Sequence, residues 1–271
     1  MRPAFHRWKQ RAACSCDVQS TKVRKHGLNG RWYARGPSIQ SYLTKATRSV
    51  GLANDIGDSA GGDMVFVDID INNCFLTLFV KVLEDNGADM EEFGIMACFC
   101  IHYKAWREFL SEFLGISLKA SKKLLIRLVH LGRPAQDIPF LWELSAQIQK
   151  AVDFLLALGK FEHLANRFAD RPNPRATRLH YALADVEESV MNDVVQSAQG
   201  IPNCHINAFM CDGAILRIAE DSKPQLQTEL ETIGARHGVS FSSCTMDRQG
   251  EPLHVEDPQT WIPLPPMSTR T

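Results

Sequence analysis

The sequence predicts an α+β fold in which a split βαβ (ferredoxin-like) antiparallel sheet carries a large helical insertion after its first strand. Three observations lead to this prediction. An apolar run at residues 63–71 is typical of a buried strand. Helical spacing of apolar residues then dominates as far as residue 194. From residue 205 the pattern returns to short strands around one helix. In this topology the first strand lies in the middle of the sheet, beside one arm of the later hairpin.

The elements before residue 200 follow from their apolar periods. The first strand runs into apolar residues that predict a helix through Leu83. Apolar residues then recur at helical spacing in four further segments, at 91–114, 118–131, 141–158 and 179–194. A break at "RPNP" precedes the last of these segments.

The elements after residue 200 are shorter. The stretch "HINAFMCDGAILRIA" at 205–219 predicts two strands joined at Asp212-Gly213, because Asp-Gly is a common hairpin turn. A helix carrying Leu226, Leu230 and Ile233 follows, and Gly238 is expected to end it. Residues 239–245 predict the last strand.

Composition excludes some classes of protein. The 271 residues are 45% hydrophobic and 23% charged, which is typical of a globular chain long enough to bury its own core. No apolar run reaches the roughly 18 residues that a membrane helix needs, so we expect no membrane partner. The eight cysteines are scattered, which favours a reduced, intracellular protein. The Arg-rich start leaves a nuclear or organellar location open.

Positive charge is concentrated in two places. Residues 1–48 carry eleven Lys or Arg and one acid, Asp17, and residues 119–133 contain no acid. This segregation favours a polyanionic partner, and the alternative is a solvated arm with one basic helix face. We divide the chain into three parts, a basic flexible arm at 1–30, a main domain at 31–250 and a Pro-rich, disordered tail at 251–271.

Two aspartates interrupt the first strand. Asp68 and Asp70 lie on one face of it, with Ile69 and Ile71 on the other. Buried carboxylates are costly unless they are paired or bind a cation, and oxygen ligands favour Mg²⁺. The predicted topology also brings Asp212 to the same sheet. The alternative is that these residues only cap a strand and form a turn.

The stretch "DINNCFLTLF" at 70–79 resembles the first palm motif of DNA polymerases, above all the family B pattern Asp-x-x-Ser-Leu-Tyr-Pro-Ser. The resemblance implies that Asp70 binds metal, that Asn73 takes the serine position and that Phe75 takes the place of the tyrosine that supports the sugar. Leu76 replaces the usual proline.

The stretch "FMCDGAIL" at 209–216 resembles the third palm motif, a strand-turn-strand that presents a metal-binding aspartate. The resemblance assigns that role to Asp212, with Gly213 in place of the usual second acid. Asp68, which shares a face with Asp70, is a further candidate metal ligand. The helix before the third motif corresponds to residues 180–195, with Glu187 at its acidic position.

The stretch "LKASKKLLIRLVHLG" at 118–132 resembles the fingers helix of the same enzymes. There the resemblance implies that Lys119, Lys123 and Arg127 bind the triphosphate of the incoming nucleotide, and cations at i and i+4 do suit a polyphosphate. Upstream, "GRWYARGPSIQSYLTKATRSVGL" at 30–52 resembles a stretch of the short transposon-type and virus-type DNA polymerases. It implies contacts with template or primer phosphates, from Arg35, Ser38, Gln40 and Arg48.

Together these motifs imply a polymerase palm with a fingers-like helical insertion. The expected activity is that of a DNA-directed DNA polymerase, a nucleotidyltransferase that uses two Mg²⁺ (or Mn²⁺) ions in DNA replication, for example of a mobile element. The expected partners are a DNA template-primer, a deoxynucleoside triphosphate (dNTP) and additional polymerase subunits or domains.

Three alternatives stay open. The chain can be a fragment or degenerate copy, a catalytically inactive palm that only binds nucleic acid. It can be an RNA-binding protein whose sheet stacks bases, although Phe66, Phe75 and Phe209 lack the expected spacing. The third alternative is a soft-metal site at Cys98, Cys100 and His102. A simpler explanation of these cysteines is that they are small buried side chains that behave as apolar residues.

Overall fold

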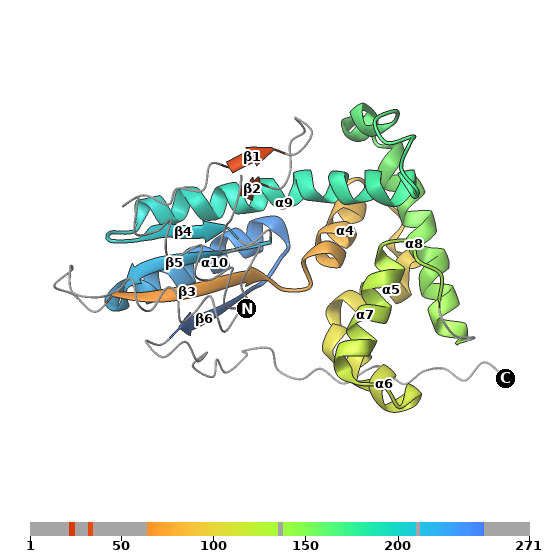
Figure 1. Cartoon of the computed structure of the whole chain (residues 1–271), viewed down its shortest axis with the longest axis horizontal. Coiled ribbons are helices and arrows are strands. Elements are labelled where there is room, and N and C mark those ends of the chain that lie inside the picture. Colours follow the sequence, from red (N-terminus) through yellow and green to blue (C-terminus); the bar gives the residue numbers. More distant parts are fainter. Residues whose placement is uncertain (1–21, 25–31, 35–63, 135–137, 210–211, 247–271) are drawn as a thin grey trace, which may run out of the picture. The chain divides into compact units, whose positions relative to one another are not determined.

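The computed structural model describes residues 22–24, 32–34, 64–134, 138–209 and 212–246 (Figure 1). These residues form two compact units. The first contains the described residues up to Asn72 and those from Asp185 onward, and the second contains Asn73–Ala184. The long helix α9 (Pro174–Gly200) contributes residues to both.

The first unit is built on a four-stranded antiparallel sheet. Its strands are β3 (Met64–Ile71), β4 (His205–Phe209), β5 (Gly213–Ala219) and β6 (Phe241–Met246). Their order is β4-β5-β3-β6, so the first strand of the sheet in the sequence lies in the middle beside the second arm of the hairpin. The predicted α+β class and the central position of residues 63–71 are therefore confirmed.

A helix packs on one face of this sheet. In α10 (Lys223–His237), Leu226 and Leu230 are buried and line a groove together with Val67 of β3. The odd-numbered residues of β3 therefore face α10, and Asp68 and Asp70 share the opposite face. The helix ends at Gly238, whose φ of 63° is in the left-handed region that glycine adopts at low cost, as the sequence predicted. A short 3₁₀ turn, Glu220–Ser222, precedes α10.

A smaller antiparallel sheet pairs β1 (Lys22–Arg24) with β2 (Trp32–Ala34). β1 falls inside residues 1–30, which the sequence analysis assigned to a flexible arm. The rest of that arm before residue 22 and the tail at 251–271 lie outside the described residues.

The second unit is helical, as predicted for the insertion. Its helices are α4 (Cys74–Asp85), α5 (Gly94–Ile101), α6 (Tyr103–Leu114), α7 (Leu118–Val129), α8 (Pro139–Ala157) and the first part of α9, with 3₁₀ turns at Met90–Phe93 and Gly159–Leu164. The segment predicted as one helix at 91–114 is divided at His102, which ends α5 and precedes α6. The core of this unit contains fully buried apolar side chains from α4, α5, α6 and α8, including Phe79, Met96, Leu110, Leu141 and Ile148.

None of the helices in the described part of the chain is both long enough and apolar enough to cross a membrane.

Asp193 joins α9 to α10 within the first unit. Its Oδ2 accepts a hydrogen bond from Arg236 (2.8 Å) and lies 2.8 Å from Nε2 of His237. The hydrogen bond with His237, and then that with Arg236, holds the pKa of Asp193 below its usual 3.8. Ser197 adds a second link, because its hydroxyl donates to Glu229 (2.8 Å).

We expect Asp193→Asn to lower the free energy of unfolding by about 1 kcal/mol at neutral pH, a modest value because the pair is partly exposed and screened. The folded-state pKa of Asp193 lies below that of the unfolded chain, so its stabilisation is present above the unfolded pKa and is lost as the pH falls through the folded pKa. The difference between wild type and variant should therefore narrow below about pH 4. Urea unfolding at several pH values measures the free energy of unfolding of both proteins. Asp221→Asn, at an exposed position, is the control and should change stability by less than about 0.5 kcal/mol.

Candidate functional site

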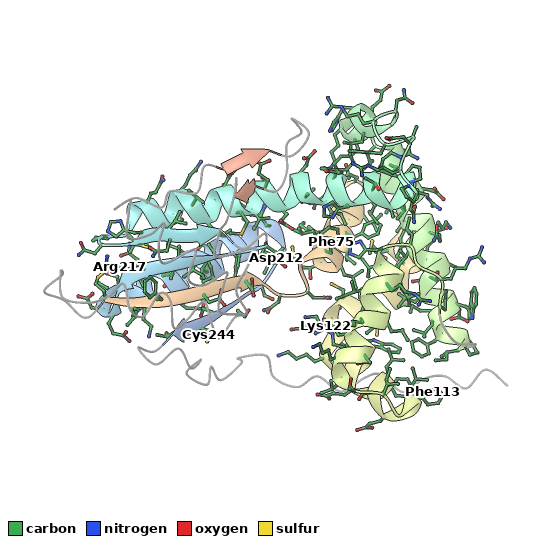
Figure 2. The ribbon with its side chains drawn as sticks, viewed as in Figure 1. Phe75, Phe113, Lys122, Asp212, Arg217 and Cys244 are labelled. Carbon is green, nitrogen blue, oxygen red and sulfur yellow. The ribbon has the colours of Figure 1, made fainter. Side chains whose placement is uncertain are left out.

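Asp70 and Asp212 meet at one end of the central strands. Asp70 is the residue of β3 directly opposite Gly213 on β5. The next pair along is joined by a hydrogen bond, in which the Ile71 N–H donates to the Asp212 carbonyl oxygen (2.9 Å). Figure 2 shows Asp212 at one end of β5, with Arg217 toward the other. The backbone of Asp212 therefore lies one position past the Asp70–Gly213 pair, opposite Ile71, although the two aspartates are far apart in the sequence.

Gly213 makes room for the Asp70 carboxylate. Hydrogen-bonded pairs alternate with closer, non-bonded pairs in antiparallel strands, and the bond at Ile71–Asp212 makes Asp70–Gly213 a close pair. A Cβ at position 213 would overlap the Ile69 carbonyl oxygen and Oδ1 of Asp70. The carboxylate therefore lies over the backbone of β5, in the space that any other residue would fill.

The predicted two-residue hairpin at Asp212-Gly213 is wrong. β4 ends at Phe209 and β5 begins at Gly213, so Gly213 belongs to the strand rather than to the turn. The close pairing with Asp70 explains the difference: the glycine is required there by the neighbouring strand, and not by the conformation of a turn. Residues 210 and 211 lie outside the described chain.

Small polar groups flank Asp70 on the side of β6. Ser242, directly opposite Asp70, is exposed, and its hydroxyl donates to the Asp70 carbonyl oxygen (3.4 Å). One step further, the Asn72 side-chain amide donates to the Ser240 hydroxyl (3.0 Å). This end of the sheet is open, whereas Asp68 is only 7% exposed between Ile215 and Cys244.

The described residues contain no group of three or more His, Cys, Asp or Glu side chains that could hold a metal ion. Asp68 therefore does not complete a three-carboxylate site with Asp70 and Asp212. Two carboxylates still suit Mg²⁺, because this ion keeps several waters and takes oxygens from substrate phosphates in addition to one or two protein carboxylates. Asp70 at the open end of the sheet and Asp212 beside Ile71 are each a candidate oxygen ligand of this kind.

Asn73 and Phe75 begin α4 in the second unit. Asn73 has a left-handed backbone (φ 47°), and its buried Nδ2 has no hydrogen-bond partner among the described residues. The ring of Phe75 stacks on His180 of α9 (5.4 Å between centroids, 12° between planes) and tilts against His130 (5.2 Å, 52°). The sequence analysis missed both histidines, because neither belongs to a motif that points to Phe75.

The cations of α7 are used in two ways. Ser117 caps the helix by accepting a hydrogen bond from the Ala120 N–H (3.2 Å), and Lys119 and Lys123 are exposed on one row of its surface. Arg127 continues this row, but its Nε donates to the Arg133 carbonyl oxygen (3.0 Å) and its guanidinium makes a second bond to the same atom. Arg127 therefore holds the turn that follows the helix.

The cysteines of α5 do not form a metal site with His102. Cys98 and Cys100 lie on a helix, so the shared face that an extended strand would give them is absent. The Cys100 thiol donates to the Thr77 hydroxyl (3.5 Å), and burial raises the pKa of Cys100, which keeps the thiol protonated. Both cysteines are partly buried, which agrees in part with the simpler explanation of small buried cysteines.

The structure describes one of the remaining predicted residues, Glu187, but not the predicted template and primer contacts. Glu187 is almost completely buried on α9. The predicted contacts with template and primer lie outside the described residues; these are Arg35, Ser38, Gln40 and Arg48.

No protein-family model and no curated protein matches the sequence. Among solved structures, the chain is similar to the POL domain of Pol1 from M. smegmatis in complex with DNA primer-template and dNTP, with a TM-score of 0.45 and 12% sequence identity. The similarity covers 81% of this chain and 46% of the other. The chain thus spans less than half the length of that structure.

We expect Gly213→Ala to lower the free energy of unfolding by about 2–3 kcal/mol, because the new methyl group forces β3 and β5 apart at Asp70. Urea unfolding of the variant measures the effect. Gly200→Ala is a matched control, since a Cβ at position 200 would meet no atom within 4 Å. A Gly213→Ala variant as stable as Gly200→Ala would contradict the close pairing of Asp70 and Gly213.

Proposed function

We propose that the chain is a template-directed DNA polymerase-like nucleotidyltransferase that uses two divalent metal ions, Mg²⁺ or Mn²⁺. The observation that carries the proposal is the position of Asp70 and Asp212 on adjacent strands at the open end of the sheet, with Gly213 leaving space for the Asp70 carboxylate. Two carboxylates brought to one site repel each other, and a divalent cation would remove that repulsion.

Asp70 and Asp212 would hold the ions in this proposal. When bound, two Mg²⁺ ions supply activation of a 3′-hydroxyl nucleophile and neutralisation of the charge on a leaving pyrophosphate. The carboxylates would fix the positions of the ions, and the β3–β5 pairing would position the backbones that carry them. Asp68 is the further candidate ligand. Because it is buried, it would support the strand that carries Asp70 and would not contact an ion directly.

The second unit would supply the contacts with the incoming dNTP. Lys119 and Lys123 are exposed one helical turn apart and would bind the polyphosphate, with Arg127 maintaining the helix end. Asn73 would take the serine position of the motif, and the ring of Phe75 would lie against the sugar. The DNA template-primer would be bound by Arg35, Ser38, Gln40 and Arg48, and additional polymerase subunits would complete the enzyme.

We expect Asp70→Asn and Asp212→Asn each to reduce primer extension in Mg²⁺ by at least about 100-fold, because each removes a charged metal ligand without changing side-chain size. A gel assay with a labelled primer-template and dNTPs measures the rate. Asp221→Asn, an exposed acid in the 3₁₀ turn before α10, is the control and should extend primers as wild type does. Equal extension by wild type and Asp70→Asn would exclude the assignment.

A catalytically inactive palm that binds nucleic acid is the second candidate, and the glycine at position 213 in place of an acid favours it. It predicts no nucleotide incorporation by wild type, with salt-sensitive DNA binding that survives Asp70→Asn and Asp212→Asn. Binding titrations at several salt concentrations, run beside the extension assay, distinguish the two functions.

For an active enzyme we expect Lys119→Ala and Lys123→Ala each to raise the KM for dNTP by about tenfold, which corresponds to roughly 1.4 kcal/mol of lost binding. Lys122→Ala removes the same charge from the same helix outside the Lys119–Lys123 row, and it should change KM by less than about threefold. Steady-state kinetics with varied dNTP measure both values. Similar KM values for the three variants would mean that only the net charge of α7 matters.

A further inference from the structure

A groove of about 230 Å³ lies between α10 and strand β6 in the first unit. Its floor consists of the buried aliphatic side chains of Val67, Leu226 and Leu230, each 3% exposed. Ser243 and Thr245 of β6 form one wall, and the rim includes Gln227. The volume is below the roughly 300–1,000 Å³ of ordinary small-molecule sites, so the groove suits a single medium side chain.

Strand β6 forms an edge of the sheet. Among the described strands it pairs only with β3, and Figure 1 shows it outermost, with α10 behind the sheet. Natural edge strands are usually protected by lysine, proline, inward-pointing charges or a bulge. The six residues of β6, "FSSCTM", contain no charged residue and no proline, and its register with β3 is continuous.

The hydrogen-bond pattern shows which backbone groups of β6 point outward. The Asn72 N–H donates to the Ser240 carbonyl oxygen (2.8 Å), one position beyond the Ile71–Phe241 pair. Bonds between antiparallel strands recur at every second residue, so Ser242 and Cys244 direct their backbone groups toward β3. Phe241, Ser243 and Thr245 therefore direct their N–H and C=O groups away from the sheet.

Ser243 and Thr245 both line the groove. The Thr245 carbonyl oxygen accepts a hydrogen bond from the Cys244 thiol (3.6 Å), whereas the outward backbone groups of Ser243 have no partner among the described residues. Residues directly opposite each other in an antiparallel pair project to the same face. A residue of an added strand opposite Ser243 or Thr245 would therefore point its side chain into the groove, onto Val67, Leu226 and Leu230. The edge can bond an extended backbone while the groove receives one of its side chains, which is the arrangement of β-strand addition.

We propose that β6 binds an extended segment of a partner protein as an additional antiparallel strand, with a Val, Leu or Ile side chain in the groove beside α10. The outward N–H and C=O of Ser243, without a partner among the described residues, suit an extended polypeptide, and the aliphatic floor suits an apolar side chain of medium size. This surface is separate from Asp70 and Asp212, and the proposal does not depend on the polymerase activity.

Ser243→Pro in the full chain tests the proposal. Proline removes the outward N–H of residue 243 and costs no bond to β3, so edge strands tolerate it at such a position. Ser243→Ala is the matched control, because it removes the side chain and keeps the N–H. The probes are two fluorescein-labelled peptides, Thr-Leu-Thr-Leu-Thr-Leu-Thr and the same peptide with Asp in place of Leu, followed by fluorescence anisotropy.

We expect saturable binding of the Leu peptide to wild type and to Ser243→Ala, and at least tenfold weaker binding to Ser243→Pro. The Asp peptide should bind wild type at least tenfold more weakly than the Leu peptide. Gln227→Trp fills the groove from its rim and leaves the β6 backbone intact, so it should also weaken the Leu peptide at least tenfold. This variant keeps the test decisive if Ser243→Pro does not fold.

The proposal is overturned if the Leu peptide shows no saturable binding to wild type, or binds Gln227→Trp and a folded Ser243→Pro as tightly as wild type. Equal binding of the Leu and Asp peptides also overturns it. Sedimentation velocity provides a last outcome. If wild type is a dimer and Ser243→Pro is a monomer, the added strand comes from a second copy of this chain. That result would overturn the proposal of a separate partner.

Discussion

The close approach of β3 and β5 at Asp70 and Gly213 is the constraint on which the candidate site depends. The Ile71–Asp212 hydrogen bond sets the register, and that register makes Asp70–Gly213 a close, non-bonded pair. Only a residue without a side chain leaves space there for a carboxylate over the neighbouring backbone. The absence of an acid at position 213, which looked like a loss relative to polymerase motifs, thus has a structural reason in this chain.

The same alternation of hydrogen bonds organises the other side of β3. Even-numbered residues of β3 bond to β6, which places the exposed Ser242 beside Asp70 and directs the backbone groups of Ser243 and Thr245 outward. The two faces of β6 therefore have different surroundings. One face continues the polar end of the sheet, and the other borders the groove beside α10. Asp193 of α9 links that helix to α10 through Arg236.

In the second unit, tertiary contacts give residues of similar chemistry different surroundings. Lys119 and Lys123 stay exposed, while Arg127 on the same row is engaged with the carbonyl oxygen of Arg133. Phe75 contacts two imidazole rings, from His180 of α9 and from His130 in the turn after α7. A charge or ring pattern on one helix identifies which residues are candidates, and the neighbouring segments determine which of them can meet a ligand.

The sequence alone determined the α+β class, the strand at 63–71, the helical insertion, the central place of that strand and the end of α10 at Gly238. These features depend on periods and turn residues that lie close together in the chain, so local patterns encode them. The sequence did not determine the division of helix 91–114 at His102, the difference in burial between Asp68 and Asp70, the histidines around Phe75 or the strand position of Gly213. These depend on register and on packing between distant segments, where a shift of one residue reverses which side chains meet. The tertiary structure decided them because contacts across strands and helices exist only after the chain has folded.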